Sequence, residues 1–342
     1  MVGATGYVGH ELVRLLSRHP GVELVALASE SYAGREISEV YPDLGPYAGS
    51  VCRKLEVEEV ARDSDVVFLA LHHGMSHPLV PAILEQGKKV IDMSADFRFR
   101  RASVYEEWYG QVHPSPELSA KAVYGLPELH REEIRQASLV ANPGCYPTSA
   151  LLAAAPLVKG GLVDGDRIII DAKSGVSGAG RGLSLRVHYA EVNENLQAYS
   201  IAGSHRHTAE IEQELGLLAG KEIRVCFTPH LIPMTRGILS TVYLDLKLPL
   251  STGEAVELYR GFYREEPFVR VLDPGELPQT KHVYGSNFCH LGIQVDHRTG
   301  RVLVVSVIDN LVKGAAGQAL QNMNLLFGLS EEEGLAYSGI FP

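Results

Sequence analysis

The chain has 342 residues, of which 45% are apolar and 21% charged, and Lys+Arg minus Asp+Glu is 31 − 41 = −10. At roughly 150 residues per domain, this length favours two domains whose cores need no disulfide for stability. The acidic balance, with Lys and Arg scattered along the chain, argues against a nucleic-acid partner, which calls for a basic stripe.

The longest apolar run, residues 150–158, is far shorter than the roughly 18 residues that span a bilayer, and no signal-like segment precedes it. The four cysteines have no CxxC pair and no short regular spacing, which argues against a disulfide framework and a zinc site. We therefore expect a cytoplasmic protein with reduced thiols, no membrane contact and no bound metal.

Short β-branched runs alternate with helical stretches through the first 140 residues. Residues 22–28, 66–71 and 89–93 are typical of strands that are buried on both faces of a parallel sheet. Between them, residues 9–19 place three leucines on one helix face, and residues 79–87 form a second helix that ends at a glycine. This alternation predicts an α/β domain.

The pattern changes near residue 167, where longer strands joined by loops begin. The predicted strands are residues 167–172, 223–227, 238–248, 289–295 and 302–308. The turn at 296–300 joins the last two as an antiparallel pair, and the helical residues 313–327 are expected to return to the first domain. The predicted fold class is α/β: a Rossmann-like dinucleotide-binding domain over 1–145 plus 310–342, and an α+β catalytic and oligomerisation domain over 146–309 with a mixed, largely antiparallel sheet.

The sequence GATGYVG at residues 3–9 is a glycine-rich loop that runs into an amphipathic helix. Glycines allow a tight turn and the close approach of a pyrophosphate, and the helix N-terminus presents free N–H groups to it. A tight turn without a ligand is the alternative, but a strand that ends about 20 residues after the last glycine favours a dinucleotide site. The predicted contacts are Gly3, Thr5, Gly6, Tyr7, Val8 and Gly9. Because only two residues precede Gly3, we expect about four to six residues of the first strand to be missing.

The end of the second predicted strand indicates which dinucleotide binds. An acidic residue there holds the ribose 2′-hydroxyl of NAD, whereas basic or hydroxyl groups hold the 2′-phosphate of NADP. Ser29, Ser31 and Arg35 favour NADP, and Glu30 favours NAD unless it points to solvent. We therefore predict NADP(H) as the cofactor.

The sequence ANPGCYPT at residues 141–148 places Cys145 at the start of a helix. The N–H groups and dipole of that helix stabilise a thiolate, which is a nucleophile. The alternative is a buried cysteine that packs as a small hydrophobe. That alternative suits Cys52, Cys226 and Cys289 better, because none of them precedes a helix.

Two histidines precede an acidic helix in SHRHTAEIE at residues 204–212. Either could serve as a general acid/base, whereas a metal pair lacks a third ligand spaced nearby and a solvated loop is the default for such polar residues. In an extended segment His205 and His207 point to opposite sides, so only one would face Cys145. We favour His207, with His205 as the alternative.

Together these motifs resemble the N-acetyl-γ-glutamyl-phosphate reductase family, within the aspartate-semialdehyde dehydrogenase superfamily. The resemblance covers essentially the whole chain and extends to LHHG at 71–74, DMSADFR at 92–98, SGAGR at 177–181, PHLIPMTRG at 229–237 and DNLVKG at 309–314. The chain departs from the family at Ser149, where Gly or Ala is usual, and in its short first strand.

The resemblance implies NADPH-dependent reduction of N-acetyl-γ-glutamyl phosphate to the semialdehyde in arginine biosynthesis, through a thioester at Cys145 and a histidine acid/base. It implies further cofactor contacts at His72, Gly74, Ser177, Gly178, Gly180 and Asn310. It implies substrate contacts at Arg98, Asn142, Arg181 and Glu191, of which Arg98 would bind the phosphate unless it belongs to an exposed arginine cluster. Family members are oligomeric, so a homotetramer or homodimer is expected.

Two other functions stay open. A reductase of an aminoadipyl phosphate from lysine biosynthesis differs only around the acyl and carboxylate ends of the substrate, which one sequence does not reveal. A catalytically silent, NADPH-binding redox sensor would use Cys145 for signalling, and the coincidence of that cysteine with the histidine segment and the glycine loop argues against it. The histidine segment also argues against an aspartate-semialdehyde dehydrogenase.

Overall fold

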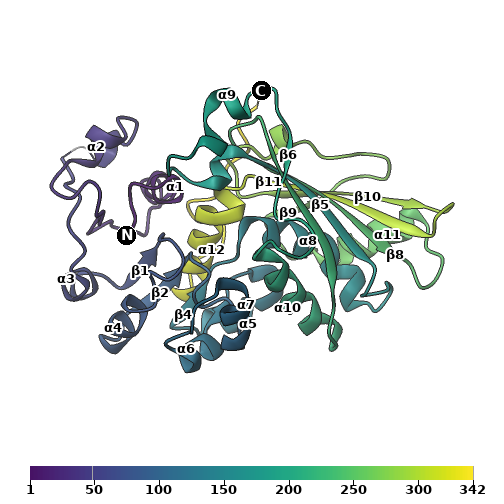
Figure 1. Cartoon of the computed structure of the whole chain (residues 1–342), viewed down its shortest axis with the longest axis horizontal. Coiled ribbons are helices and arrows are strands. Elements are labelled where there is room, and N and C mark those ends of the chain that lie inside the picture. The colour runs from purple at the N-terminus through teal and green to yellow at the C-terminus, as the bar shows by residue number, and fades with distance from the viewer. Residues whose placement is uncertain (48, 342) are drawn as a thin grey trace. The chain divides into compact units, whose positions relative to one another are not determined.

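The computed structural model describes residues 1–47 and 49–341, and it divides into two compact units (Figure 1). Unit 1 comprises 1–144 and 315–336, and unit 2 comprises 145–314 and 337–342. Residue 145 and residues 310–314 and 337–341, which the sequence predicts for the first domain, thus lie in unit 2. Among the described residues, no helix is long and apolar enough to cross a membrane.

Unit 1 is built on a parallel sheet. Its strands are β1 (Val66–Leu69), β2 (Lys89–Asp92), β3 (Val123–Tyr124) and β4 (Leu139–Ala141), in the order β1-β2-β4-β3. Every pairing is parallel. The sheet confirms the predicted α/β class and the strands at 66–71 and 89–93.

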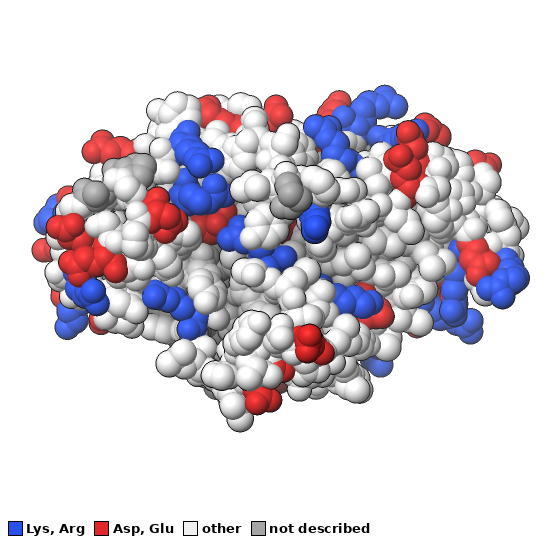
Figure 2. All heavy atoms as spheres, turned by 90° about the horizontal axis from the view of Figure 1, so that it is seen from above, with Lys and Arg blue, Asp and Glu red and all other residues white. Residues whose placement is uncertain are grey.

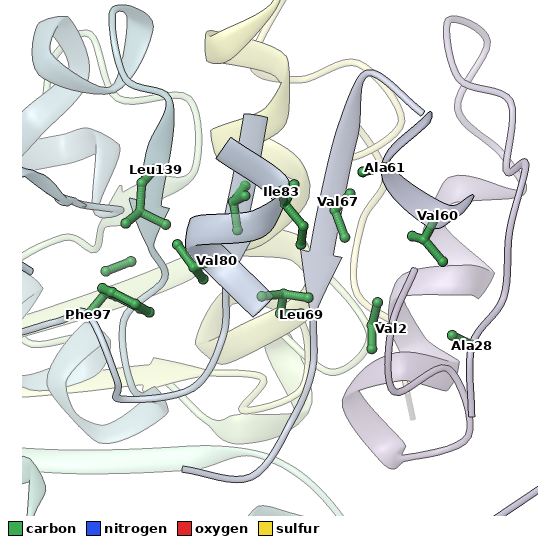
Figure 3. Packing of buried hydrophobic residues seen from close by; sticks show 12 residues of the cluster. Val2, Ala28, Val60, Ala61, Val67, Leu69, Val80, Ile83, Phe97 and Leu139 are labelled. Carbon is green, nitrogen blue, oxygen red and sulfur yellow. The ribbon is translucent and has the colours of Figure 1, made fainter. Parts of the chain in front are cut away.

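The strand predicted at 22–28 is reduced to isolated bridges. Ala28 bridges Val2 and Arg53, and Val2 also bridges Leu69, all in parallel. Val2 is the one bridging residue ahead of the glycine loop, so the ladder on this side of the sheet is a single residue long. Val2 and Ala28 nevertheless pack into the buried cluster beside Val67 and Leu69 (Figure 3).

Helices surround this sheet. They are α1 (Tyr7–Leu16), α2 (Ile37–Val40), α3 (Val57–Arg62), α4 (Leu79–Glu85), α5 (Ala102–Tyr109), α6 (Pro116–Lys121), α7 (Pro127–Arg135) and α12 (Gly317–Leu326), with a 3-10 turn η1 at Gly45–Tyr47. The predicted helix at 313–327 begins as a π-helix, η5 (Val312–Ala316), before α12. Helix α12 packs on α1, α7 and β2, so this C-terminal helix does return to unit 1.

Unit 2 is built on a seven-stranded mixed sheet in the order β6-β7-β5-β8-β11-β10-β9. The strands are β5 (Ile168–Gly175), β6 (Gln197–Ala198), β7 (Val225–Ile232), β8 (Ile238–Asp245), β9 (Val269–Val271), β10 (Cys289–Asp296) and β11 (Arg301–Ile308). Only the pairs β5–β7 and β9–β10 are parallel. The β10–β11 hairpin confirms the predicted antiparallel pair.

One face of this sheet is covered and the other is not. Burial alternates along β5, β7 and β8, as expected when a sheet has one packed face. Helices α8 (Cys145–Lys159), α10 (His207–Ala219) and α11 (Thr252–Phe262) pack on the strands. The remaining short elements are α9 (Tyr189–Val192), η2 (Val176–Ala179), η3 (Leu185–Val187) and η4 (Thr280–His282).

On the face shown in Figure 2, charged side chains lie in small groups. In the view of Figure 2, Lys and Arg side chains lie among Asp and Glu side chains, with uncharged surface between the groups. The acidic excess of the chain is therefore not gathered into one patch on that face.

Helix α8 is the central element of unit 2, with residues 146–158 all buried. Pro156 lies inside the helix and has no N–H to donate to the carbonyl of Leu152, four residues earlier. The hydroxyl of Tyr263 donates to that carbonyl at 2.7 Å. A side chain outside the helix thus satisfies the carbonyl that the proline leaves without a partner, which lets the helix stay buried.

The surroundings of Ser149 explain why a serine is accommodated where Gly or Ala is usual in the family. Its hydroxyl lies 2.9 Å from the Ser240 hydroxyl on β8 and 3.0 Å from the Ser306 hydroxyl on β11. All three side chains are fully buried. The small polar cluster ties α8 to two central strands, and buried hydroxyls are tolerated there because each finds a partner.

We predict that Ser149→Ala lowers the free energy of unfolding by about 1–3 kcal/mol, because the buried Ser240 hydroxyl loses its partner and the Ser306 hydroxyl keeps only the Cys289 sulfur at 3.4 Å. Urea denaturation measures the change. The control replaces all three serines by alanine, which removes both sides of each bond and should cost less than the sum of the three single substitutions. A Ser149→Ala cost below about 0.5 kcal/mol would show that the two remaining hydroxyls pair without it.

Candidate active site

The glycine loop of unit 1 brings backbone segments into close contact. A Cβ on Gly3 would lie 2.2 Å from the carbonyl oxygen of Ala70, and a Cβ on Gly9 would lie 2.1 Å from that of Gly3. Gly3 also has a φ of +80°, which favours glycine. Gly6 is the N-cap of α1 and no side chain caps the helix. The first N–H groups of α1 are thus open to an anion, as a dinucleotide pyrophosphate requires.

The three residues predicted to select NADP differ in their surroundings. The Ser29 hydroxyl is buried and lies 2.7 Å from the Thr5 hydroxyl in the glycine loop. Ser31 and Arg35 are exposed, and the Arg35 guanidinium donates to Glu39 at 2.8 Å. Ser29 therefore acts within the chain by fixing the loop, whereas Ser31 and Arg35 are accessible.

Arg98 is not an exposed member of an arginine cluster. Arg100 and Arg101 are exposed, but Arg98 is only 5% exposed. Its Nε donates to the carbonyl of Asn142 at 2.8 Å and another nitrogen donates to the carbonyl of Met93 at 2.9 Å. The guanidinium thus holds the turn after β2 against the segment that leads to Cys145.

Both the nitrogen and the oxygen of the Asn142 side-chain amide form hydrogen bonds within unit 1. Its nitrogen donates to the carbonyl of Ala315 at 3.2 Å, and its oxygen accepts from Asn322 at 3.0 Å. The side chain is 1% exposed. It therefore fixes the loop ahead of Cys145 from inside unit 1.

Cys145 begins α8, as predicted, and it is half-buried. A Cβ on Gly314 would lie 2.8 Å from the Cβ of Cys145. Two backbone segments far apart in sequence therefore touch at Cys145, and only glycine fits at 314. Cys52 and Cys289 are buried as expected, whereas Cys226 is exposed, because it lies on the uncovered face of β7.

His205 and His207 do not point to opposite sides. Residues 203–206 form a turn instead of an extended segment, and His207 is the first residue of α10. The two imidazole rings lie 4.8 Å apart, and both pack against the ring of Tyr146, at 5.7 and 6.0 Å. The turn brings both histidines to the side of α8 where the residue after Cys145 lies.

The two histidines have different hydrogen-bonding roles. The Nδ1 of His205 accepts the backbone N–H of His207 at 3.1 Å, so the His205 ring proton sits on Nε2. Burial, assisted by the charges of Arg206 and Arg186, lowers the pKa of His205 to about 4. His205 is therefore neutral at physiological pH.

Two tyrosines that the sequence did not single out complete this cluster. The Tyr199 hydroxyl donates to the Tyr146 hydroxyl at 3.3 Å, and Tyr146 donates to the carbonyl of His230 at 3.0 Å. Burial raises the pKa of Tyr199 to about 12 and raises that of Tyr146 further. Both stay protonated. Tyr146 could have been found from its place beside Cys145, whereas nothing in the sequence marks Tyr199.

Asn310 links two loops of unit 2. Its amide oxygen accepts the N–H of Gly237 at 2.6 Å, and its nitrogen donates to the Ser177 hydroxyl at 3.0 Å. The neighbouring Asp309 carboxylate, missed by the sequence prediction, accepts the N–H groups of Gly285 and Leu311 and pairs with Arg236. These bonds fix the loops that carry Ser177 and Asn310.

The other predicted residues lie on exposed or partly exposed segments. Gly178 lies in η2, Gly180 follows it with a φ of +82°, and Arg181 is half-buried. Glu191 lies in α9 and is exposed. In unit 1, His72 is exposed and Gly74 has a φ of +86°.

Two family models match the chain, one on each unit. Residues 1–137 match "Semialdehyde dehydrogenase, NAD binding domain", and residues 145–310 match "Semialdehyde dehydrogenase, dimerisation domain". The fold is that of aspartate semialdehyde dehydrogenase II from Vibrio cholerae, with a TM-score of 0.73 at 21% identity over 96% of this chain and 97% of the other. An aspartate semialdehyde dehydrogenase from Candida albicans, solved with NADP, has a TM-score of 0.70 at 19% identity over 95% and 97%. Fold and sequence together define a semialdehyde dehydrogenase.

Curated relatives narrow that class. An N-acetyl-gamma-glutamyl-phosphate reductase from Pelotomaculum thermopropionicum is 58% identical over 100% of this chain and 98% of its own. One of the same name from Symbiobacterium thermophilum is 59% identical over the same shares. The chain belongs to the N-acetyl-gamma-glutamyl-phosphate reductase family.

We predict that Gly314→Ala lowers the free energy of unfolding by about 1–3 kcal/mol, because its methyl group must displace Cys145 or its own backbone. The matched control is Gly261→Ala in α11, where nothing lies within 4 Å of an added Cβ. That substitution should stabilise the chain by about 0.5–1 kcal/mol, since it removes backbone freedom from the unfolded state. Equal effects at the two positions, measured by urea denaturation, would contradict the close approach.

Proposed function

We propose that the chain catalyses the NADPH-dependent reduction of N-acetyl-γ-glutamyl phosphate to N-acetylglutamate 5-semialdehyde and phosphate, a step of arginine biosynthesis. The observation that carries the proposal is Cys145 at the start of buried helix α8, with His205 and His207 packed on its neighbour Tyr146. The relatives named for this reaction match the whole chain. The cytosol follows from such a biosynthetic role.

Cys145 acts as the nucleophile. Its thiolate, stabilised by the N-terminal end of α8, attacks the acyl carbon, and the acyl–phosphate bond breaks to release phosphate and leave a thioester. When bound, NADPH would supply the hydride for reduction of the thioester carbonyl and would become NADP⁺. The resulting thiohemiacetal on Cys145 collapses to the aldehyde and restores the thiolate.

His207 acts as the acid/base, with His205 holding it in place. A general acid works best when its pKa is near the working pH, and a ring whose pKa is about 4 is almost never in its imidazolium form at neutral pH, so it is a poor proton donor. His205 instead accepts the His207 N–H and so fixes the first turn of α10. His207 then protonates the thiohemiacetal oxygen and takes that proton back on collapse.

The glycine loop of unit 1 fits a dinucleotide. The contacts at Gly3 and Gly9 leave no room for a side chain, and the uncapped start of α1 presents its N–H groups to the pyrophosphate. Thr5, Tyr7 and Val8 complete this loop. Ser31 and Arg35 are accessible to a 2′-phosphate, with Ser29 supporting the loop. His72, Gly74, Ser177, Gly178, Gly180 and Asn310 are the further proposed cofactor residues.

Arg98 is the proposed cation for the substrate phosphate. Its buried guanidinium donates to two carbonyl oxygens and keeps its fixed charge. Asn142 supports the same loop, while Arg181 and Glu191 are proposed for the other end of the substrate. The chemistry needs such a cation because the acyl phosphate is an anion and the chain is acidic overall.

The chain is proposed to form a homodimer or homotetramer through unit 2. Residues 145–310 match a family model described as a dimerisation domain. The uncovered face of its sheet carries half-exposed side chains on alternate positions of β5, β7 and β8. Pairing two such faces across a two-fold axis would bury them both.

We predict that Cys145→Ser reduces turnover to background while the Kd for NADPH stays within about threefold, since the hydroxyl is a far poorer nucleophile of nearly the same size. The assay is phosphate-dependent reduction of NADP⁺ with N-acetylglutamate semialdehyde, beside aspartate semialdehyde and an aminoadipate semialdehyde derivative. Wild-type activity with a different aldehyde would change the assigned substrate, and activity with none of the three would favour the redox-sensor function.

The second test separates the histidines. We predict that His207→Asn lowers kcat by at least about 100-fold with little change in KM, because a proton transfer is lost. His205→Asn keeps a side chain that can hydrogen-bond and should lower kcat by about tenfold, without moving the pKa values of the pH profile above pH 5. A larger loss at His205 would reverse the assignment.

A further inference from the structure

Two buried carboxylates of unit 1 join the loop after β1 to the loop after β2. We call these segments loop 71–77 and loop 92–98. The carboxylate of Asp96 accepts the backbone N–H of Gly74 at 2.7 Å on Oδ1 and that of Ser76 at 3.0 Å on Oδ2. The Tyr105 hydroxyl also donates to Oδ1, at 3.2 Å. Asp96 is fully buried, so these donors hold the carboxylate in place of water.

Asp92 is also fully buried but is held differently. Its Oδ1 accepts the Ser76 hydroxyl at 2.7 Å and the Ser94 N–H at 3.1 Å. Its Oδ2 accepts only the Ser94 hydroxyl, at 2.8 Å. A hydroxyl can turn and accept a hydrogen bond instead of donating one. A backbone N–H cannot.

The two loops lie at the edge of the sheet where ligands bind in folds of this kind. Strands β1 and β2 are parallel neighbours, so both loops leave the carboxyl ends of the strands. Loop 71–77 starts beside Ala70, whose carbonyl oxygen limits Gly3 of the glycine loop. Loop 92–98 ends at Arg98, two residues after Asp96.

Other groups face Asp96 from the surrounding elements. The Nε2 of His77 lies 3.9 Å from its Oδ2, and burial lowers the pKa of that ring. The His113 ring contacts the backbone oxygen of Asp96 at 2.6 Å. Among the described residues, the hydrogen-bond donors to the Asp96 carboxylate are two backbone amides and one phenol.

We propose that Asp96 is a positioning residue for the reductase reaction: it shapes loop 71–77 for NADPH and, through loop 92–98, sets Arg98. This inference rests on the proposed function for its substrate, but not for its cofactor. The carboxylate is needed because both of its oxygens accept backbone N–H groups. An asparagine would place its own N–H₂ against one of those amides, leaving a buried donor facing a donor.

The test compares Asp96→Asn with Asp92→Asn, which make the same chemical change in two fully buried side chains. For Asp96→Asn we expect the Kd for NADPH, from fluorescence titration, to rise by at least about tenfold, the loss expected for a hydrogen bond to a charged group. For Asp92→Asn we expect a change within about threefold, because the Ser94 oxygen, which already accepts the Asp96 N–H at 3.1 Å, has a second lone pair that can accept the new N–H₂.

A merely structural defect would lower the folded fraction and the apparent kcat, while the folded molecules would bind NADPH with the wild-type Kd. Unchanged binding in both variants, or equal weakening in both, would overturn the proposal. In the reverse assay the KM for phosphate should also rise in Asp96→Asn, because Arg98 loses its support. The NADPH titration contains no acyl substrate, so it stands even if the wild-type chain acts on a different aldehyde.

If Asp96→Asn does not fold, hydrogen exchange of the wild-type chain tests whether Asp96 anchors loop 71–77. The amides of Gly74 and Ser76 should exchange at least about tenfold more slowly than unstructured amides, since both are hydrogen-bonded to a buried acceptor. The same protection is expected in Asp92→Asn. Unprotected exchange at these two amides would contradict the anchoring role of Asp96.

Discussion

The burial of helix α8 is the constraint on which unit 2 depends. Every residue from 146 to 158 is buried, so the helix can lie only where strands and helices enclose it. The close approach of Gly314 fixes the start of the helix, and Ser149 hydrogen-bonds to two strands. The Tyr263 hydroxyl donates to the carbonyl that Pro156 leaves without a partner. Cys145, the first residue of this helix, is therefore positioned by the core of the unit.

Unit 1 has a different structural requirement, because the binding of a dinucleotide depends on backbone N–H groups and needs no reactive side chain. The short parallel strands end in loops that are tied to one another by side-chain carboxylates and by Arg98. Loops held in this way can present amides to an anion without a ligand to shape them. Unit 1 thus carries the loops proposed for anion binding, and unit 2 carries the cysteine proposed for covalent catalysis.

Many of the buried polar groups in both units sit among fixed partners. Asp309 accepts backbone N–H groups and pairs with Arg236, and Asn310 joins Gly237 to Ser177. The cluster around Tyr146 keeps His205 neutral through burial. Side chains that the family resemblance connects with ligands are in several cases engaged by the chain itself, so their roles include holding the loops.

The sequence by itself determined the α/β class, the mixed sheet and the start of α8 at Cys145, because periodicity, glycine spacing and helix-start residues act over a few positions. It also carried the family, through motifs spread over the whole chain. Only the tertiary structure decided that 22–28 forms bridges instead of a strand, since pairing depends on a partner from elsewhere in the chain. The same holds for the two histidines against Tyr146, Tyr199 beside Tyr146, Gly314 against Cys145 and Asp96 hydrogen-bonded to loop 71–77. Each of these is a contact between residues distant in sequence, and a local pattern holds no record of which distant group will fill the space beside it.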